Sequence, residues 1–253
     1  LYNIVDRIFV GRGIGSVAIA ATTVAFPIML IIFAVAMLIG IGATALISIR
    51  LGQQKKEEAE RVAGNAAAML VVLPSILAVV YLLFPDPILR LFGSSEDVLP
   101  YARDFTHIIM MGAPLGAIGF GLNNFIRAEG NPRLAMMTQI IGGVTNVVLN
   151  YYFIFELGMG IKGSALGTVL GQLVSALWVT GYFLTGRSLV KIRLKNLMPH
   201  LPTLISITSI GFAPFAMQMA SSIQQSILNK TLLAYGGDLA LAAVGIIMSI
   251  LTL

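Results

Sequence analysis

The sequence has no cysteine, only two histidines and few charged residues. Without cysteine, these 253 residues offer no disulfide framework, no thiolate metal site and no thiol nucleophile. Only 11% of the residues are charged and 57% are hydrophobic, whereas about 25% of residues are charged in an average soluble domain. This composition excludes a soluble enzyme and predicts a protein whose solvent is the lipid bilayer.

Long uncharged runs divide the chain into predicted membrane spans. A helix needs about 20 mostly apolar residues to cross the hydrocarbon layer. We expect eight helices, six of them complete, over Leu1–Val10, Val17–Ile49, Val62–Pro85, Phe105–Ile126, Leu134–Phe155, Gly163–Gly186, Leu201–Asn229 and Leu239–Leu253. Both ends look cut, so we expect a fragment of a longer protein.

The second run is too long for one crossing, because its residues would form a helix of about 50 Å. Proline suits the first turn of a helix. We therefore predict that this helix begins near Pro27 and that the residues from Val17 onward form a loop or interfacial turn.

The basic residues predict orientation and partners. Most Lys and Arg residues fall in alternate loops that share one side of the membrane, and cytoplasmic loops carry such an excess. We expect a multi-pass protein of the plasma (inner) membrane with a cytoplasmic amino terminus. The formal net charge of +5 is spread over short loops beside apolar runs. Anionic membrane lipid, and no nucleic acid, is therefore the expected partner of these charges.

A weak internal repeat predicts the domain organisation. Gly15–Ala21 resembles Gly237–Ala243, 222 positions further on, and each copy joins two apolar helices after a glycine-containing turn. Such a repeat predicts an intact protein of about 440 residues with twelve helices in two bundles, as in many transporters. The expected fold is all-α: an amino-terminal six-helix transmembrane lobe over residues 1–190, then helices seven and eight of a second lobe over residues 191–253.

Polar residues inside spans are the candidate functional residues, since unpaired polar groups are unfavourable in hydrocarbon. Asp6 is the first candidate, with an interfacial Asp6–Arg7 anchor as the alternative. Gln139, Asn146 and Asn150 share one face of a helix at spacings of seven and four residues. Amides also hold membrane helices together without any transport role, and spacing alone favours that second interpretation.

A third polar set lies in the seventh span. Its members could either hold helices together or contact the substrate, and the sequence leaves both interpretations open. They are Gln218, Ser221, Ser222, Gln224, Gln225, Ser226 and Asn229.

Several motifs together resemble the multidrug and toxic compound extrusion (MATE) family of efflux antiporters, in its bacterial multidrug-exporter branch. The resemblance covers the whole chain and depends on the order and spacing of its motifs. These are Val5–Gly11, Ala25-Phe26-Pro27, Leu51-Gly52-Gln53, Arg127–Pro132, Gly158–Ala165 and Asn229–Asp238.

The resemblance implies export of organic cations in exchange for protons or sodium ions, with no other cofactor and no catalysis, by a protein that is monomeric when full length. It places the ion-coupling and substrate-binding cluster on Asp6, Asn146, Asn150 and Thr168, with Gln139 beside them on the stripe. It also makes a sodium site at Asp6, Asn146 and Asn150 an open alternative to a proton site. Some relatives carry Asp at the position of Asn150, so proton coupling depends here on fewer groups.

Two other functions are compatible with long apolar helices. A lipid-linked precursor flippase shares the architecture, but its pyrophosphate substrate requires Arg or Lys in the cavity, and the complete spans have none. A membrane-embedded enzyme requires His, Cys or paired carboxylates at helical spacing, and the complete spans hold no such set, since His107 stands alone.

Overall fold

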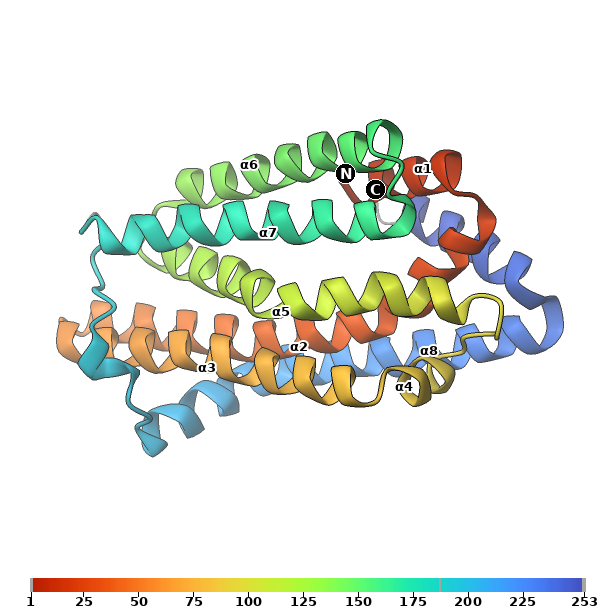
Figure 1. The fold of residues 1–253 in the computed structure, drawn as a ribbon. Coiled ribbons are helices and arrows are strands. Elements are labelled where there is room, and N and C mark those ends of the chain that lie inside the picture. Colours follow the sequence, from red (N-terminus) through yellow and green to blue (C-terminus); the bar gives the residue numbers. More distant parts are fainter. Residues whose placement is uncertain (1, 187, 252–253) are drawn as a thin grey trace.

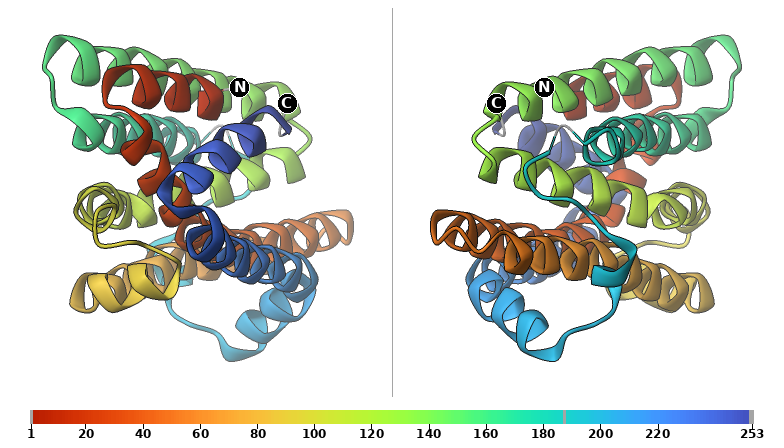
Figure 2. Two further views of the ribbon diagram at one scale, coloured as in Figure 1. Left: turned by 90° about the vertical axis from the view of Figure 1, so that its right-hand side faces the viewer. Right: turned by 90° about the vertical axis from the view of Figure 1, so that its left-hand side faces the viewer.

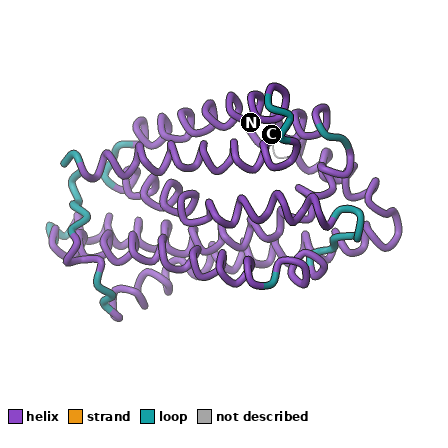
Figure 3. The backbone as a smooth tube through the Cα atoms, in the orientation of Figure 1, coloured by secondary structure: helices purple, strands orange, loops and turns teal. Residues whose placement is uncertain are grey.

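The computed structural model describes residues 2–186 and 188–251, and this part of the chain is helical with no β-strand (Figure 3). The all-α prediction is therefore confirmed. The elements are α1 (Tyr2–Gly13), α2 (Ser16–Gly52), α3 (Lys56–Leu83), α4 (Pro85–Leu91), α5 (Leu99–Ala128), α6 (Pro132–Tyr151), the π-helix η1 (Tyr152–Glu156), α7 (Gly160–Leu184), the 3-10 helix η2 (Leu194–Leu197) and α8 (Leu201–Leu251).

The long helices lie side by side and give the bundle two ends (Figure 1). One end holds α4 and the loop 92–98, and we call it the α4 end. The opposite end holds the connector, residues 188–200, which joins α7 to α8. Seen end-on, α1, α6 and α7 form one side of the bundle, and α2, α3 and the first part of α8 form the other, while the end of α8 rises toward α1 (Figure 2).

Five of the helices, α2, α3, α5, α7 and α8, are long and apolar enough to cross a membrane. Large apolar side chains also point outward: Val72, Ile76 and Val79 of α3 are 52%, 52% and 54% exposed. Such a surface is favourable in lipid and unfavourable in water. The chain is therefore a polytopic membrane protein, as predicted. Helix α6 is less apolar than these five because three amide side chains lie within it.

Two apolar clusters fill the bundle, one toward each end. The cluster at the α4 end includes Val24, Tyr81 and Leu99, and the cluster at the connector end includes Ile47, Phe125 and Ile207. Each cluster joins helices that are distant in sequence. Together they hold α1 and α6 in fixed positions relative to α2 and α8.

The prediction that the second helix begins near Pro27 is wrong. Helix α2 begins at Ser16, spans 37 residues and contains Pro27 in its interior. The residues from Ala18 to Ala21 are buried, so packing stabilises the turns that precede the proline. A proline inside a membrane helix is tolerated where a neighbour bonds the carbonyl that it leaves free, and such a neighbour is present here.

The two glycines aligned by the internal repeat share an unusual backbone conformation. Gly15 has φ 116° between α1 and α2, and Gly237 has φ 62° at the bend inside α8. A positive φ favours glycine because a Cβ atom would clash with the backbone. The bend divides α8 into the seventh and eighth helices expected from the sequence. The assignment of these helices to a second lobe stays a prediction.

Candidate functional site

One face of α1 is fixed against α6 and η1. The ring of Phe9 lies 5.6 Å from that of Phe155 and 6.1 Å from that of Tyr151, both in edge-on geometry. Gly13 lies so close to Ile154 of η1 that a Cβ atom would not fit. Asp6 is one turn before Phe9, so it shares this face. The packing therefore points the carboxylate of Asp6 toward the end of α6.

The structure brings four of the five predicted site residues together. The amide nitrogen of Asn150 donates a hydrogen bond to Oδ1 of Asp6. The amide nitrogen of Asn146 donates to Oγ1 of Thr168 on α7, at 3.2 Å, and that hydroxyl donates to the carbonyl of Ser164, at 3.0 Å. A polar cluster thus joins α1, α6 and α7 near the α4 end of the bundle.

Glycines of α7 allow the two asparagines to pack against its backbone. A Cβ atom on Gly171 would lie 2.9 Å from Cβ of Asn146, and a Cβ atom on Gly167 would lie 2.9 Å from Cγ of Asn150. Small residues at helix interfaces permit this kind of close approach. Asn146 is 3% exposed and Asn150 is 0% exposed as a result. The site is therefore closed on the side of α7.

The two amide oxygens of the cluster have no hydrogen-bond partner. Oδ1 of Asn146 and Oδ1 of Asn150 are both buried and unsatisfied. An unsatisfied buried polar group is unfavourable by about 1–3 kcal/mol, so it points to a missing ligand or to a functional role. In this structure the nitrogen of Asn150 faces Asp6, and its oxygen lies toward Gly167 of α7. Carboxylate and amide oxygens are the donors that hard cations prefer. A proton shared with the carboxylate or a bound sodium ion both suit this chemistry.

Gln139 does not join the cluster. Its side chain is exposed and makes no hydrogen bond within the described part of the chain. The buried face of α6 contains Thr138, Gly142, Asn146 and Asn150, which follow one another every four residues. Four residues turn an α-helix by about 40° more than one full turn, so this buried face winds slowly around the helix axis. Toward the start of α6 the buried face therefore holds Thr138, and Gln139 lies outside it.

Arg7 points away from Asp6, as expected for adjacent helix residues. Its guanidinium donates to the carbonyl of Gly245 in the last part of α8, while Asp6 accepts from Asn150 on α6. The alternative of an interfacial Asp6–Arg7 pair therefore does not describe this structure. Instead, the two neighbours join α1 to two different helices.

In the third polar set, the structure shows two residues as structural contacts. The Ser222 hydroxyl donates to the carbonyl of Pro27 at 2.8 Å, and the Asn229 amide donates to the carbonyl of Thr23 at 3.1 Å. Both side chains are at most 1% exposed. Gln224, in contrast, is exposed.

A second buried polar cluster, which the sequence does not predict, surrounds an asparagine at the connector end. Asn65 of α3 is 1% exposed and its amide nitrogen donates to the carbonyls of Asn196 and Met198, at 2.9 and 3.2 Å. The backbone nitrogen of His200 donates back to its Oδ1 at 2.7 Å. A lone amide at the start of an apolar run is the only sequence signal, because its partners are backbone groups.

The fold and this polar cluster define a class: a polytopic helical membrane protein with a buried polar cluster inside its helix bundle. Known proteins identify the family. The family model MatE matches residues 1–152, so the chain belongs to the MatE family, whose members are transporters and not enzymes. The resemblance found in the motifs is thereby confirmed.

The relatives agree with this family. The multidrug export protein MepA of Staphylococcus aureus is 28% identical over 97% of this chain and 54% of its own length. A solved structure of the MATE multidrug transporter DinF-BH, in complex with a dye, is 35% identical, with a TM-score of 0.93 over 100% of this chain and 56% of its own. The chain thus spans about half the length of the proteins that it matches.

Two further structures show a multidrug resistance MATE family transporter in opposite states. The inward-facing conformation matches with a TM-score of 0.93 at 28% identity, over 99% of this chain and 57% of its own. The outward-facing conformation matches with a TM-score of 0.84 at 27% identity, over 97% and 58% respectively. Transporters of this family therefore alternate between two accessible states, and this structure is more similar to the inward-facing one.

Proposed function

We propose that the full-length protein exports organic cations and other drugs from the cell by exchange for a cation, either protons or sodium ions. The observation that carries this proposal is the cluster of Asp6, Asn146 and Asn150, in which a carboxylate accepts from Asn150 and the oxygens of both buried amides have no partner. Multidrug export by the relative MepA supports the class of substrate. The drug itself is not chemically modified in this process.

In the proposed mechanism, Asp6 alternates between a state with the coupling cation bound and a state without it. Ionised, it binds the coupling cation together with the oxygen atoms of Asn146 and Asn150. The entering ion favours the state from which the drug has left, and the drug favours the opposite state. Each ligand shifts the alternating-access equilibrium only by its difference in affinity for the two states. The glycines of α7 keep the site narrow on one side.

We also propose the membrane setting: the plasma (inner) membrane, with the connector end of the bundle in the cytoplasm and the α4 end outside. The support is the positive-inside rule, since basic residues such as Arg61, Lys191 and Arg193 lie at the connector end. In this setting residues 1–190 form the first lobe, residues 191–253 begin the second, and lipid surrounds a monomer. A lipid-linked precursor flippase is not favoured, because the relatives export drugs.

The decisive experiment is Asp6→Asn in the full-length transporter, with efflux of a cationic dye from energised vesicles as the measurement. The amide keeps the shape and a hydrogen bond to Asn150 but removes the charge, so efflux per folded protein should be lost while membrane insertion persists. Asp104→Asn is the matched control, because that carboxylate forms an exposed ion pair with Lys162 at 3.3 Å. Efflux at the wild-type rate in Asp6→Asn would refute the proposed site.

The same vesicles identify the coupling ion. Efflux is measured once with a pH gradient alone and once with a sodium gradient alone. Only one of the two gradients should drive efflux. Because Asn150 is an amide and Asp6 the only carboxylate in the cluster, a single gradient should suffice. Efflux that needs neither gradient would contradict antiport.

A further inference from the structure

Pro27 leaves a free backbone acceptor in the first third of α2. Proline has no backbone N–H, so the carbonyl four residues earlier, that of Thr23, lacks its helical donor. The amide nitrogen of Asn229 in α8 supplies this donor from outside the helix, at 3.1 Å. Asn229 is 0% exposed. A residue of the proposed second lobe therefore completes the backbone of a helix in the first lobe.

The same amide reaches a second carbonyl. Asn229 also donates to Phe92 in the loop 92–98, at 3.4 Å, while its own oxygen accepts from Gln225 at 3.1 Å. Gly93 has φ +92°, and a Cβ atom there would lie 3.1 Å from the backbone of Asn229. The loop thus packs directly on α8, and Gln225 keeps the amide of Asn229 turned toward the two carbonyls.

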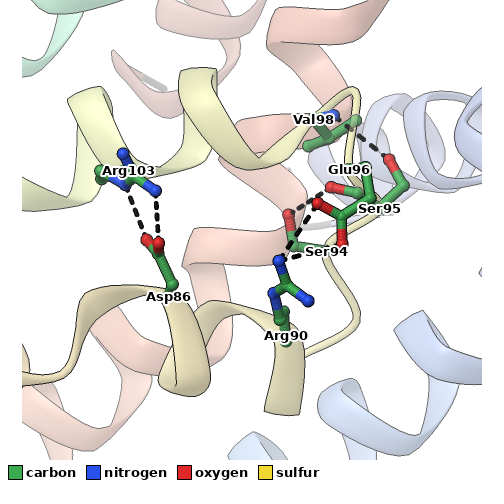
Figure 4. A network of polar contacts seen from close by, with 7 residues as sticks. All are labelled: Asp86, Arg90, Ser94, Ser95, Glu96, Val98 and Arg103. Carbon is green, nitrogen blue, oxygen red and sulfur yellow. Dashed lines mark hydrogen bonds and ion pairs between the residues drawn. The ribbon is translucent and has the colours of Figure 1, made fainter.

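A second contact joins the loop to the bend of α8. The hydroxyl of Ser95 donates to Oδ2 of Asp238 at 2.9 Å, and the backbone nitrogen of Val98 donates to that hydroxyl at 3.2 Å. Figure 4 shows an ion pair of Arg90 in α4 with Glu96 in the loop, and a second ion pair, of Asp86 with Arg103, that joins the flanking helices α4 and α5. The loop is therefore a fixed surface against which α8 docks.

We propose that Asn229, Ser95 and Asp238 form a latch that closes the α4 end of the transporter, with the carbonyl freed by Pro27 as its principal acceptor. The inference rests on the proposed function, because a latch matters only where the lobes separate. The structure is more similar to the inward-facing than to the outward-facing relative, as expected with the α4 end closed. When that end opens, Asn229 leaves both carbonyls to water, so the latch holds only the closed state.

The test is a double-mutant cycle in the full-length transporter. Asn229→Leu removes the donor, whereas Pro27→Ala returns a backbone N–H to the carbonyl of Thr23. Spin labels at Asp97→Cys and Tyr235→Cys, both exposed, report the distance between loop and bend, and this chain has no cysteine of its own. Asn229→Leu should lower the ratio of closed to open populations at least about fivefold. In the Pro27→Ala background the decrease should be about threefold smaller, since the acceptor already has a donor.

Gln224→Leu is the control, because it removes an exposed amide from the same helix and should leave the distances unchanged. If Pro27→Ala does not fold, Ser95→Ala with Asp238→Asn tests the second contact and should also favour the open population. Unchanged distances in Asn229→Leu, or an equal effect in both backgrounds, would overturn the latch. Failure of the wild type to export dye would instead refute the proposed function, and the distance measurement would remain informative.

Discussion

Two clusters of buried asparagine in this bundle differ in how completely their amides are bonded. Asn65, at the connector end, donates to three backbone carbonyls, including that of Arg61 at 3.1 Å, and its oxygen accepts from His200. Asn146 and Asn150 each donate once, and their oxygens have no partner. Burial is the same in both places, so it does not separate structure from function. The two clusters differ instead in their unfilled acceptors.

The connector shows what a satisfied cluster achieves. Arg193 forms an ion pair with buried Glu60 at 2.9 Å, and the backbone of Val190 donates to Glu129 at 2.9 Å. Tyr182 donates to the other oxygen of Glu129 at 3.0 Å. With Asn65, these contacts fasten the connector to α3 and α5 as far as His200. A site that must exchange ligands needs the opposite arrangement, in which some acceptors stay available.

The largest expected effect comes from breaking the satisfied cluster. Asn65→Leu should destabilise the protein by about 3 kcal/mol, because it leaves several buried backbone groups of the connector without partners. The measurement is the thermal unfolding midpoint in detergent, together with the rate of proteolysis within residues 188–200. Gln224→Leu is the control for loss of an exposed amide. An unchanged midpoint would mean that the connector is held by its apolar contacts alone.

Asn150→Leu should affect ion binding more than stability, the opposite of Asn65→Leu. Loss of a hydrogen bond to the carboxylate of Asp6 and of one oxygen ligand should weaken binding of the coupling ion by at least about tenfold. The unfolding midpoint should fall less than in Asn65→Leu, since one of its two polar atoms is unsatisfied in the native protein. Ion-dependent protection against thermal unfolding measures the first effect and the midpoint without ion the second. A larger loss of stability than in Asn65→Leu would show that the cluster of Asp6, Asn146 and Asn150 has a structural role.

Gly167→Ala tests the cluster from the side of α7. The added methyl group would lie 2.9 Å from Cγ of Asn150, so α6 and α7 must separate slightly. We expect a loss of about 1–2 kcal/mol in stability and a weaker affinity for the coupling ion. Gly181→Ala is the matched control on the same helix, because nothing lies within 4 Å of its Cβ position. Equal effects of the two substitutions would show that helix separation does not reach the site.

Much of the fold and the core of the site follow from the sequence, and the failures have a common cause. Uncharged runs place the spans, and the resemblance to the MATE family implies the cluster of Asp6, Asn146, Asn150 and Thr168 that the structure assembles. The start of α2 was misplaced because Asn229, far away in sequence, compensates for Pro27. The role of Asn65 was missed because its partners are backbone carbonyls of the connector. Backbone acceptors leave no signature in a sequence, whereas side-chain pairs do.

The smallest effect is expected for Gln139→Leu, and it separates helical spacing from actual packing. Gln139 lies on the same ideal helix face as Asn146 and Asn150, yet it is exposed and makes no hydrogen bond within the described part of the chain. The substitution should change the free energy of unfolding by no more than about 0.5 kcal/mol, and it should leave the affinity for the coupling ion unchanged. Asn146→Leu, seven residues later, should lower that affinity, because it removes one of the two unsatisfied oxygens. If both substitutions weaken ion binding equally, the ion contacts Gln139 as well as Asn146 during transport. The site would then extend beyond the buried face of α6.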